Sequence, residues 1–515
     1  MIAIVLSVYS VLLLFDTLSV FQQVGYSVKK YNKWLYKSKN RILFRIFISV
    51  LPLLFLSAVK EIVSFDELSY AVFYCLLAYL CAFAQSGTVK TRVKAKFSKR
   101  FLRILILSAV LSFFVYYAFD LLIQKVFRLT ACYSFVLIWL YPYIVAISAV
   151  LWLPYERILY RYFVNRCKKN LSKNKKLIRI GITGSAGKTS VKNYLYEMLS
   201  VDYKTYATPK SFNTPLGICI AVKEMPKDTE VFIAEMGARK RGDIKTLCDI
   251  VRPSVGIITS ITKQHMETFG TVENLKKTKF ELIEGLTGDS VGVFSSDDEG
   301  ARSLYERAEV KKISAGINGV AVRAENIKLT PTGTEFTIII GGERYPVRAK
   351  LLGRANVTNI CVSASVAYEL GVSPERIVLA IGRLKPPPHR LEFYTAPSGV
   401  TVIDDGYNAN LKGVMSSAEM LKEFDGRKFA VVSGIAEGGK YSEELNEEVG
   451  KALKDAVAVL VAVGTYSDFI INGAKGGKCR ILKVSDLKNA ESVLKSELKR
   501  GDTVIFINDL PDSYI

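Results

Sequence analysis

The chain has 515 residues, half of them hydrophobic, and a formal net charge of +22 from 70 Lys and Arg against 48 Asp and Glu. This length allows about three domains. The charge excess belongs almost wholly to residues 1–176, which hold 25 basic and 6 acidic residues, whereas residues 177–515 hold 45 and 42. The larger part of the chain therefore lacks the basic excess typical of nucleic-acid-binding proteins, and we expect no nucleic-acid partner.

Five apolar stretches precede residue 155, and each is long enough, or nearly so, to cross a bilayer, which takes about 20 residues. They comprise residues 2–24, 42–59, 68–85, 101–119 and 131–154. Basic segments at 29–41, 90–100 and 157–176 alternate with turns that carry few cations. The positive-inside rule then places the N-terminus outside and everything after Pro154 in the cytoplasm. The sequence predicts a multi-pass protein of the cell (inner or plasma) membrane, in contact with lipid, with a helical region at 1–154 and a basic juxtamembrane linker at 155–176.

Residues 177–200 read LIRIGITGSAGKTSVKNYLYEMLS. An apolar run ends in a glycine-rich turn, and a helical pattern begins directly after Gly187, Lys188 and Thr189. The backbone N–H groups of such a turn and the N-terminus of the helix bind phosphate oxygens, the lysine adds a full charge, and the hydroxyl can ligate Mg²⁺. Ile182 stands where the GxxxxGK[ST] pattern has its first glycine. The strand–turn–helix order nevertheless favours a nucleoside triphosphate site over an ordinary glycine-rich turn.

The next elements alternate short apolar strands with helices, which predicts an α/β fold. We expect strands at 177–182, 231–235, 255–260 and 291–294, helices at 241–250, 272–286 and 355–370, and an antiparallel insertion at 321–349. The proline-rich segment 385–390 is a stiff connector and marks a domain boundary. A second, Rossmann-like α/β unit follows, with strands at 400–404, 428–433, 458–463, 480–484 and 503–507. The predicted domains are thus a central ATP-binding domain at 177–388 and a C-terminal domain at 389–515.

Polar side chains follow several of these strands. Glu235 ends a buried strand, where it could hold Mg²⁺ or lie at a solvated edge. His265 follows the next strand and could ligate a second Mg²⁺ or simply be solvated. Asn356 and Asn359 begin a helix, where asparagine is also a good cap. The Asp- and Asn-rich loop 404–410 is either a ligand site at the carboxyl edge of a sheet or a plain turn.

Six motifs occur in one order between residues 178 and 463. They are TGSAGKTS, SFNTPLGI, AEMGARKRGDI, HMETFG with KKTKFEL, LLGRANVTN, and PPPHRLE followed by DDGYNAN. In this order they resemble the Mur ligase family, the ATP-dependent ligases that add amino acids to peptidoglycan precursors. EMGA, HMETFG and DDGYNAN together are most similar to the type that adds D-alanyl-D-alanine.

The resemblance implies ATP and Mg²⁺ as cofactors and assigns a role to each motif residue. The catalytic residues would be Lys188, His265 and Lys279. Mg²⁺ would be held by Thr189, Glu235, His265 and Lys279, the last carried as a carbamate. The nucleotide would contact Gly184, Ser185, Ala186, Gly187, Lys188, Thr189, Ser190, Asn356, Asn359, Arg390 and Asp405, with the two asparagines near the adenine. The substrate cleft would be shaped by Asn213, Thr214, Asn408 and Asn410.

The expected activity is that of a membrane-anchored, ATP-dependent amide ligase acting through an acyl phosphate on a cell-envelope precursor of the peptidoglycan type. Its partners would be a small-molecule or lipid-linked carboxylate acceptor and an amine donor. One alternative is a polyamino-acid synthetase, similar to the poly-gamma-glutamate enzymes. Another is a nucleotide-binding membrane scaffold without ligase activity.

Overall fold

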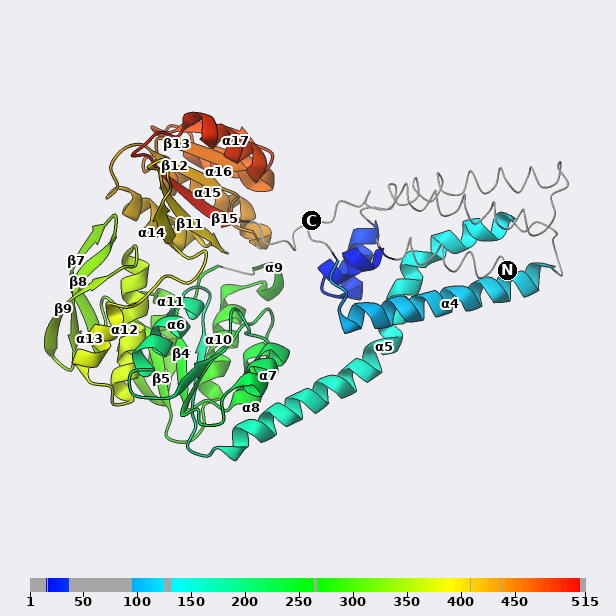
Figure 1. Cartoon of the computed structure of the whole chain (residues 1–515), viewed down its shortest axis with the longest axis horizontal. Helices are drawn as coiled ribbons and strands as arrows, with labels where there is room; N and C mark the ends of the chain where they lie inside the picture. Colours follow the sequence, from blue (N-terminus) through cyan, green and yellow to red (C-terminus); the bar gives the residue numbers. More distant parts are fainter. Residues whose placement is uncertain are drawn as a thin grey trace. The chain divides into compact units, whose positions relative to one another are not determined.

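A computed structural model of the chain describes residues 15, 17–36, 95–124, 131–263, 266–407, 409–436 and 438–509. The chain forms two compact units (Figure 1). One comprises Met1–Leu159 together with Asp512–Ile515, and the other comprises Tyr160–Pro511. The first contains the predicted membrane region, and the second contains every motif of the predicted nucleotide site.

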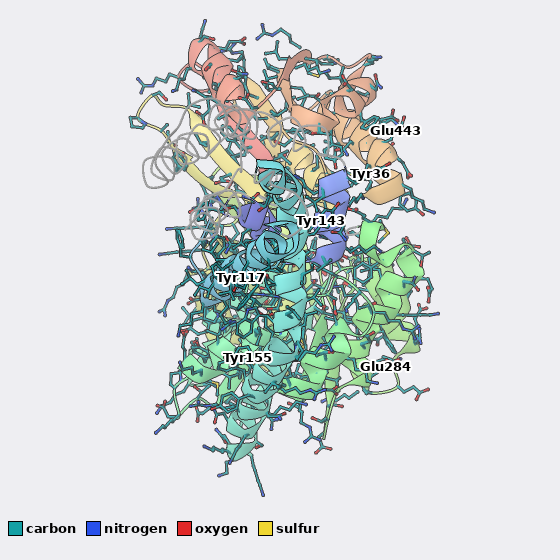
Figure 2. All side chains as sticks on the ribbon, turned by 90° about the vertical axis from the view of Figure 1, so that its right-hand side faces the viewer. Tyr36, Tyr117, Tyr143, Tyr155, Glu284 and Glu443 are labelled. Atoms are coloured by element: carbon teal, nitrogen blue, oxygen red, sulfur yellow. The ribbon has the colours of Figure 1, made fainter. Side chains whose placement is uncertain are left out.

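The first unit contains helix α4 (Lys99–Gln124) and most of helix α5 (Ala131–Lys173). The hydroxyl groups of Ser108 and Ser148, one from each helix, form a buried hydrogen bond of 2.9 Å. The exposed side chains of these helices include many large apolar ones, three of which are labelled in Figure 2. They include Ile106, Phe114, Tyr117, Leu121, Tyr143, Ile147, Leu151, Tyr155 and Ile158.

Two of the five predicted membrane spans, 101–119 and 131–154, fall on α4 and α5. The other three lie largely outside the described residues. In the part of the chain that the structure describes, one helical segment, Tyr143–Lys173, is long and apolar enough to cross a bilayer by length and composition. This finding supports one candidate span and does not support five.

The second unit is built first around a nine-stranded sheet with the order β2-β3-β1-β4-β5-β6-β7-β8-β9. Its strands are β1 (Ile178–Thr183), β2 (Thr205–Ala207), β3 (Val231–Glu235), β4 (Val255–Ile258), β5 (Val291–Ser295), β6 (Lys311–Ala315), β7 (Val322–Thr330), β8 (Gly333–Ile340) and β9 (Glu343–Ala349). Pairing is parallel from β2 to β7 and antiparallel from β7 to β9. The predicted antiparallel insertion is thus confirmed, and it extends the parallel sheet.

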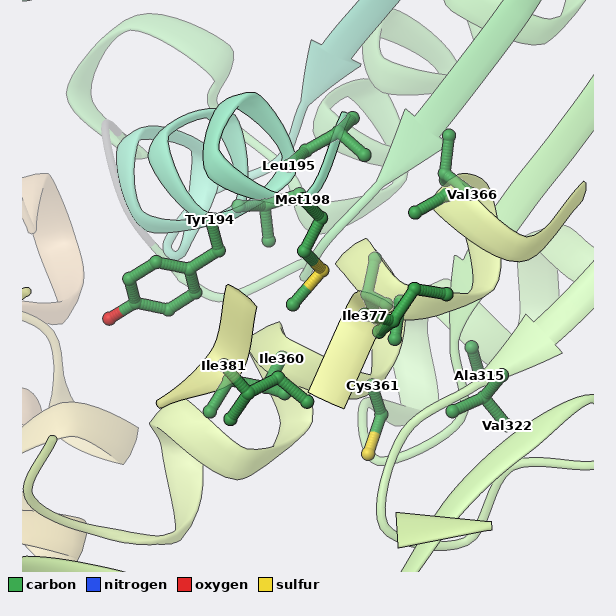
Figure 3. Packing of buried hydrophobic residues seen from close by; sticks show 14 of the residues in the cluster. Tyr194, Leu195, Met198, Ala315, Val322, Ile360, Cys361, Val366, Ile377 and Ile381 are labelled. Atoms are coloured by element: carbon green, nitrogen blue, oxygen red, sulfur yellow. The ribbon is translucent and has the colours of Figure 1, made fainter. Parts of the chain in front are cut away.

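Helices cover this sheet (Figure 1). They are α6 (Lys188–Leu199), α7 (Pro215–Glu224), α8 (Asp243–Val251), α9 (Met266–Phe269), α10 (Val272–Glu284), α11 (Glu299–Arg307), α12 (Arg354–Glu369) and α13 (Pro374–Ile381). Figure 3 shows the buried core in which α6 packs against α12 and α13, with Leu195, Met198 and Ile360 among its side chains. This packing fixes α6, and with it the loop that precedes the helix.

The last domain contains a six-stranded sheet with the order β10-β11-β15-β12-β13-β14. Its strands are β10 (Glu392–Thr395), β11 (Thr401–Tyr407), β12 (Lys428–Val432), β13 (Val459–Val463), β14 (Arg480–Val484) and β15 (Thr503–Asp509). Its helices are α14 (Leu411–Leu421), η1 (Gly439–Tyr441), α15 (Ser442–Leu453), η2 (Gly464–Tyr466), α16 (Ser467–Ala474) and α17 (Leu487–Glu497). All strand pairs are parallel except β10 with β11.

The predicted strands and helices of both domains are present, with ends shifted by a few residues. The prediction missed the short strands β2, β6 and β10. Strand β2 has only three residues. Strands β6 and β10 are mainly exposed or half-buried, so they lack the apolar run of a buried parallel strand.

The predicted linker 155–176 is helical as far as Lys173, because α5 continues through it. Val164, Cys167 and Leu171 are buried and belong to the same hydrophobic cluster as residues of α7, α8 and β3. Their spacing of three and four residues gives one apolar helix face. The basic residues of this segment obscured that face in the sequence. The segment is therefore part of the packing of the second unit, while its juxtamembrane role stays a prediction.

Candidate functional site

The phosphate loop lies between β1 and α6, at the carboxyl end of β1, which pairs with β3 on one side and β4 on the other. Gly184 and Gly187 have positive φ angles of 153° and 82°. A Cβ atom on Gly184 would lie 2.0 Å from the Thr259 hydroxyl oxygen, and one on Gly187 would lie 2.7 Å from Asn359 Oδ1. Both positions therefore require glycine, because a side chain would collide and would disfavour the backbone conformation.

The end of β4 holds the loop in place. The N–H of Ser185 donates to the Ser260 carbonyl at 2.8 Å, and the N–H of Ala186 donates to the Ser260 hydroxyl at the same distance. Lys188 Nζ donates to the carbonyls of Gly184 and Ser185 at 2.7 and 3.1 Å. The ammonium group thus lies against the loop, beside the N-terminus of α6, where a phosphate group would find both a full and a partial positive charge.

Glu235 ends β3, next to the end of β1, and its carboxylate is the hub of a buried network. It accepts hydrogen bonds from Thr189 Oγ1 at 3.0 Å and from Asn213 Nδ2 at 3.1 Å. Lys192 Nζ lies 3.4 Å from the same oxygen that Thr189 contacts, and both side chains of this ion pair are almost fully buried. The Lys192 ammonium also donates to the carbonyl of Lys210. The network holds the carboxylate beside the phosphate loop.

The Thr189 hydroxyl and the Glu235 carboxylate fit a Mg²⁺ site beside a polyphosphate, since Mg²⁺ prefers oxygen ligands and usually takes only one or two from carboxylates. Among the described residues, no group of three or more His, Cys, Asp or Glu side chains is arranged to hold a metal ion. His265 lies outside those residues. Its metal ligation therefore stays a prediction.

Lys279, from α10, is buried and lines the same cavity as Lys188. Burial lowers the pKa of the Lys279 ammonium well below its ordinary range, and the positive charge of Lys188 lowers it further, against the opposing effect of Asp243 and Glu281. The Lys279 ammonium therefore loses its proton more readily than that of an exposed lysine. Burial also lowers the pKa of Lys188, to about 8, although Glu235 opposes the shift.

Arg390 and Tyr407 also line the cavity of the phosphate loop. Arg390 lies in the connector and stacks over the Tyr407 ring, with 4.6 Å from its guanidinium carbon to the ring centre. Burial lowers the pKa of Arg390, and Asp405 opposes this effect. Burial raises the pKa of the Asp405 carboxyl to about 6, with Arg390 acting in the opposite direction. The C-terminal domain thus places a guanidinium beside the phosphate loop.

A cavity of roughly 690 Å³ joins these elements, a size typical of small-ligand sites. The predicted residues that line it are Gly184, Ser185, Ala186, Gly187, Lys188, Thr189, Asn213, Thr214, Glu235, Lys279 and Arg390. Residues separated by two hundred positions in the sequence therefore share one cavity, although their individual roles stay predictions.

The other predicted site residues do not line this cavity. Ser190 is buried in α6. Asn356 accepts a hydrogen bond from the Tyr194 hydroxyl and donates one to the Leu352 carbonyl, so its side chain joins α6 to α12. Asn410 caps α14 by accepting from the Gly413 N–H at 3.0 Å.

Of the remaining predicted residues, Asn359 lies against Gly187 of the phosphate loop. Asp405 is placed near Arg390, as described above. Asn408 lies outside the described residues. The predicted contacts of Asn359 with the adenine and of Asp405 with the nucleotide therefore stay predictions.

Sequence reasoning missed Lys192, the buried partner of Glu235, and several residues that line the cavity. Lys192 follows Lys188 by four positions, so the two lie on one helix face, and this spacing could have indicated a second lysine at the site. The cavity is also lined by Tyr160 of α5 and by the turn Arg239–Lys240–Arg241. The turn is part of a motif that carried the resemblance, but its three cations had no assigned role.

Comparison with known proteins gives two family matches. The Mur ligase middle domain matches residues 182–367, and the Mur ligase glutamate ligase domain matches residues 389–507. The two matches cover the two domains described above and leave the first unit unmatched.

The chain is also similar to two relatives named UDP-N-acetylmuramoyl-tripeptide–D-alanyl-D-alanine ligase. The one from Mycobacterium bovis is 31% identical over 353 residues, which cover 63% of this chain and 69% of the relative. The one from Bacillus subtilis is 28% identical over 332 residues, which cover 64% of this chain and 72% of the relative.

Among solved structures, the MurF ligase of Thermotoga maritima in complex with ADP is similar at 27% identity with a TM-score of 0.62. The match covers 68% of this chain and 80% of that one. That protein was crystallised with a nucleoside diphosphate, which accords with the phosphate loop found here.

Proposed function

The chain belongs to the Mur ligase family, and from this premise we propose that it joins D-alanyl-D-alanine to the peptide of a muramoyl-tripeptide precursor of peptidoglycan. As a family member it is an ATP-dependent ligase that forms an amide bond. The two relatives named above support this reaction and do not favour the synthesis of a polyamino acid.

In the proposed reaction, a carboxylate oxygen of the acceptor attacks the γ-phosphorus of ATP, and the bond from that phosphorus to the β–γ bridging oxygen breaks. ADP leaves, and the acceptor becomes an acyl phosphate. The amine of the dipeptide attacks the acyl carbon and loses a proton. The tetrahedral intermediate expels inorganic phosphate, and an amide remains. Most of the protein's contribution to such a reaction is positioning and charge neutralisation.

The cavity residues fit these tasks. Lys188 and the N-terminus of α6 neutralise the charge of the transferred phosphoryl group. Thr189 and Glu235 would hold Mg²⁺, which neutralises triphosphate charge when it is bound. Arg390, brought in from the connector, adds a guanidinium that can hold a phosphate oxygen and helps close the site against water.

Lys279 fits the role of the carbamate that the family resemblance implies. A lysine reacts with CO₂ only as the neutral amine, and burial together with the Lys188 charge favours that form. Reaction releases one proton and leaves a carboxylate, so a cation becomes an anion in a cavity rich in cations. With ¹³CO₂, a carbamate carbon signal should appear in the wild-type chain and be absent from Lys279→Ala. A spectrum that is the same in both would reject the carbamate.

One observation carries the proposed ligase activity: the phosphate loop, Glu235, Lys279 and Arg390 share one cavity. The test uses the full chain with ATP, Mg²⁺, UDP-N-acetylmuramoyl-tripeptide and D-alanyl-D-alanine. Wild type should form the amide with equal release of ADP, and Lys188→Ala should abolish both. Lys277→Ala removes an exposed lysine from α10 and should leave the activity intact. Amide formation that persists in Lys188→Ala would overturn the assignment.

We also propose that the first unit attaches the enzyme to the membrane, with the catalytic unit in the cytoplasm. The support is the alternation of apolar and basic segments in residues 1–176, the apolar surface of α4 and α5, and the part of the candidate span Tyr143–Lys173 that belongs to the first unit. After cell lysis the chain should sediment with membranes and resist extraction by high salt. Release into the soluble fraction by salt alone would contradict this proposal.

A further inference from the structure

The turn Arg239–Lys240–Arg241 presents three exposed cationic side chains at the cavity that contains Lys188. Within the described residues, no carboxylate forms an ion pair with any of the three. Long basic side chains on ordinary surfaces commonly find a partner or lie in open solvent, but these three line a cavity. Their position therefore calls for an anionic ligand.

The carboxylates nearest to the turn are already engaged. The Asp243 carboxylate accepts hydrogen bonds from the backbone N–H groups of Arg239 and Lys240 at 2.9 and 3.0 Å. Glu281 accepts those of Gly242 and Lys245 at 2.8 and 3.0 Å, and so satisfies the first turn of α8. These hydrogen bonds fix the backbone of the turn. The side chains of the turn, and not the helix N-terminus, are left to bind a ligand.

The cavity also holds more positive charge than a nucleotide site requires. Leaving aside Lys279, which the proposed carbamate would make an anion, five of its lining residues are cations: Lys188, Arg239, Lys240, Arg241 and Arg390. Only two are carboxylates, Glu235 and Asp243. Lys188, the N-terminus of α6 and Arg390 provide enough positive charge to bind a triphosphate with its Mg²⁺. The turn at 239–241 therefore provides a second cationic region in the same cavity.

Part of the cavity lining is apolar. Tyr160 and Ala238 pack against the same hydrophobic cluster, which is formed by residues of α5, α7, α8 and β3, and both residues line the cavity. The cavity is therefore lined both by side chains of an apolar cluster and by the three cations of the turn. Such a lining suits a ligand that joins an anionic group to a less polar part.

We propose that the Arg239–Lys240–Arg241 turn binds the diphosphate group of the acceptor. This inference rests on the ligase activity proposed above. A diphosphate carries several negative charges within a few ångströms, and arginine side chains bind phosphate oxygens in bidentate fashion. Both a nucleoside diphosphate and a polyprenyl diphosphate carry this group, so the chemistry of the turn serves a UDP-linked and a lipid-linked acceptor alike.

The experiment compares the full wild-type chain with the triple variant Arg239→Ala/Lys240→Ala/Arg241→Ala. A matched control, Lys168→Ala/Lys169→Ala/Lys175→Ala, removes three exposed lysines that line a separate cavity at the end of α5. Each protein is assayed with three acceptors: UDP-linked, polyprenyl-diphosphate-linked and free muramoyl-tripeptide. The Michaelis constants for acceptor and for ATP are measured in each case, and the melting temperature reports on folding.

The turn variant should raise the acceptor KM roughly 10- to 100-fold for whichever diphosphate-linked acceptor the wild type uses, and leave the ATP KM unchanged. With the free tripeptide, the two proteins should behave alike. The acceptor that wild type uses best identifies the source of the diphosphate. An unchanged acceptor KM, or an equal rise in the control variant or with the free tripeptide, would overturn this inference. If wild type makes no amide from any acceptor, the proposed ligase activity fails instead.

Discussion

The buried ion pair between Lys192 and Glu235 allows a sharp test of the site. Its nitrogen–oxygen distance is 3.4 Å, and the side chains are only 3% and 2% exposed. Replacing Lys192 by Met keeps the length of the side chain and removes its charge. The Glu235 carboxylate would then be buried with hydrogen bonds from Thr189 and Asn213 but without its closest cation.

Removing one partner of a buried pair typically costs about 3–5 kcal/mol, because the remaining charge is left in a poorly solvated place. We expect the lower end of this range for Lys192→Met. Two hydrogen bonds to Glu235 remain, and the Lys188 ammonium is close enough to interact with the carboxylate. The free energy of unfolding, measured by urea titration with circular dichroism, should fall by about 3 kcal/mol.

Two further variants test the cause. In Lys192→Met/Glu235→Gln neither charge remains, so the double variant should be more stable than the sum of the two single losses predicts. Lys204→Met breaks the pair of Lys204 with Asp228, whose atoms are closer, at 2.9 Å, but whose side chains are 66% and 63% exposed. Its effect on stability should be small, because solvent screens exposed pairs. Strict additivity in the double variant, or an equal loss in Lys204→Met, would refute the role of burial.

Three other predictions concern charge and backbone. Burial lowers the pKa of Lys188 to about 8, so kcat/KM for ATP should fall as pH rises through 8. In Lys188→Arg this fall should move to higher pH, because arginine keeps its proton. An identical pH profile in the two proteins would show that Lys188 is not the titrating group. The pKa of Asp405 is about 6 in the folded chain and 3.8 ordinarily, so its contribution to stability is complete below pH 3.8 and lost as pH rises through 6. Relative to Asp405→Asn, wild-type stability measured by urea titration should therefore decline across that window, and a constant difference would contradict the assigned pKa. Gly187→Ala should lower the melting temperature more than Gly371→Ala. Both positions have positive φ, but only the Cβ added at Gly187 would meet another atom within 4 Å. Equal shifts would show that the collision with Asn359 does not affect stability.

Much of the fold was predictable because it depends on local patterns. Apolar runs with turn residues between them located the strands, and the insertion at 322–349 was recognisable from its period of two. The phosphate loop was predictable because its glycines are adjacent in sequence to a strand and a helix. Glu235 was predictable because the carboxyl ends of parallel strands meet at one edge.

Other features depended on packing between distant segments. The family resemblance implied that Asn356 contacts the nucleotide, which stays a prediction, but no local pattern indicated that Tyr194, 162 residues away, donates a hydrogen bond to its amide oxygen. The basic composition of 155–176 indicated a linker, whereas three apolar residues in it pack into the second unit.

By itself, the sequence determined the family, the phosphate loop and the order of strands and helices, because each is encoded by neighbouring residues. Only the tertiary structure decided that Lys192 is the buried partner of Glu235 and that the turn at 239–241 lines the cavity of Lys188. The physical reason is that burial and charge pairing are properties of the space around a side chain. That space is formed by segments that are far apart in the sequence, so no local sequence pattern indicates which of them will meet.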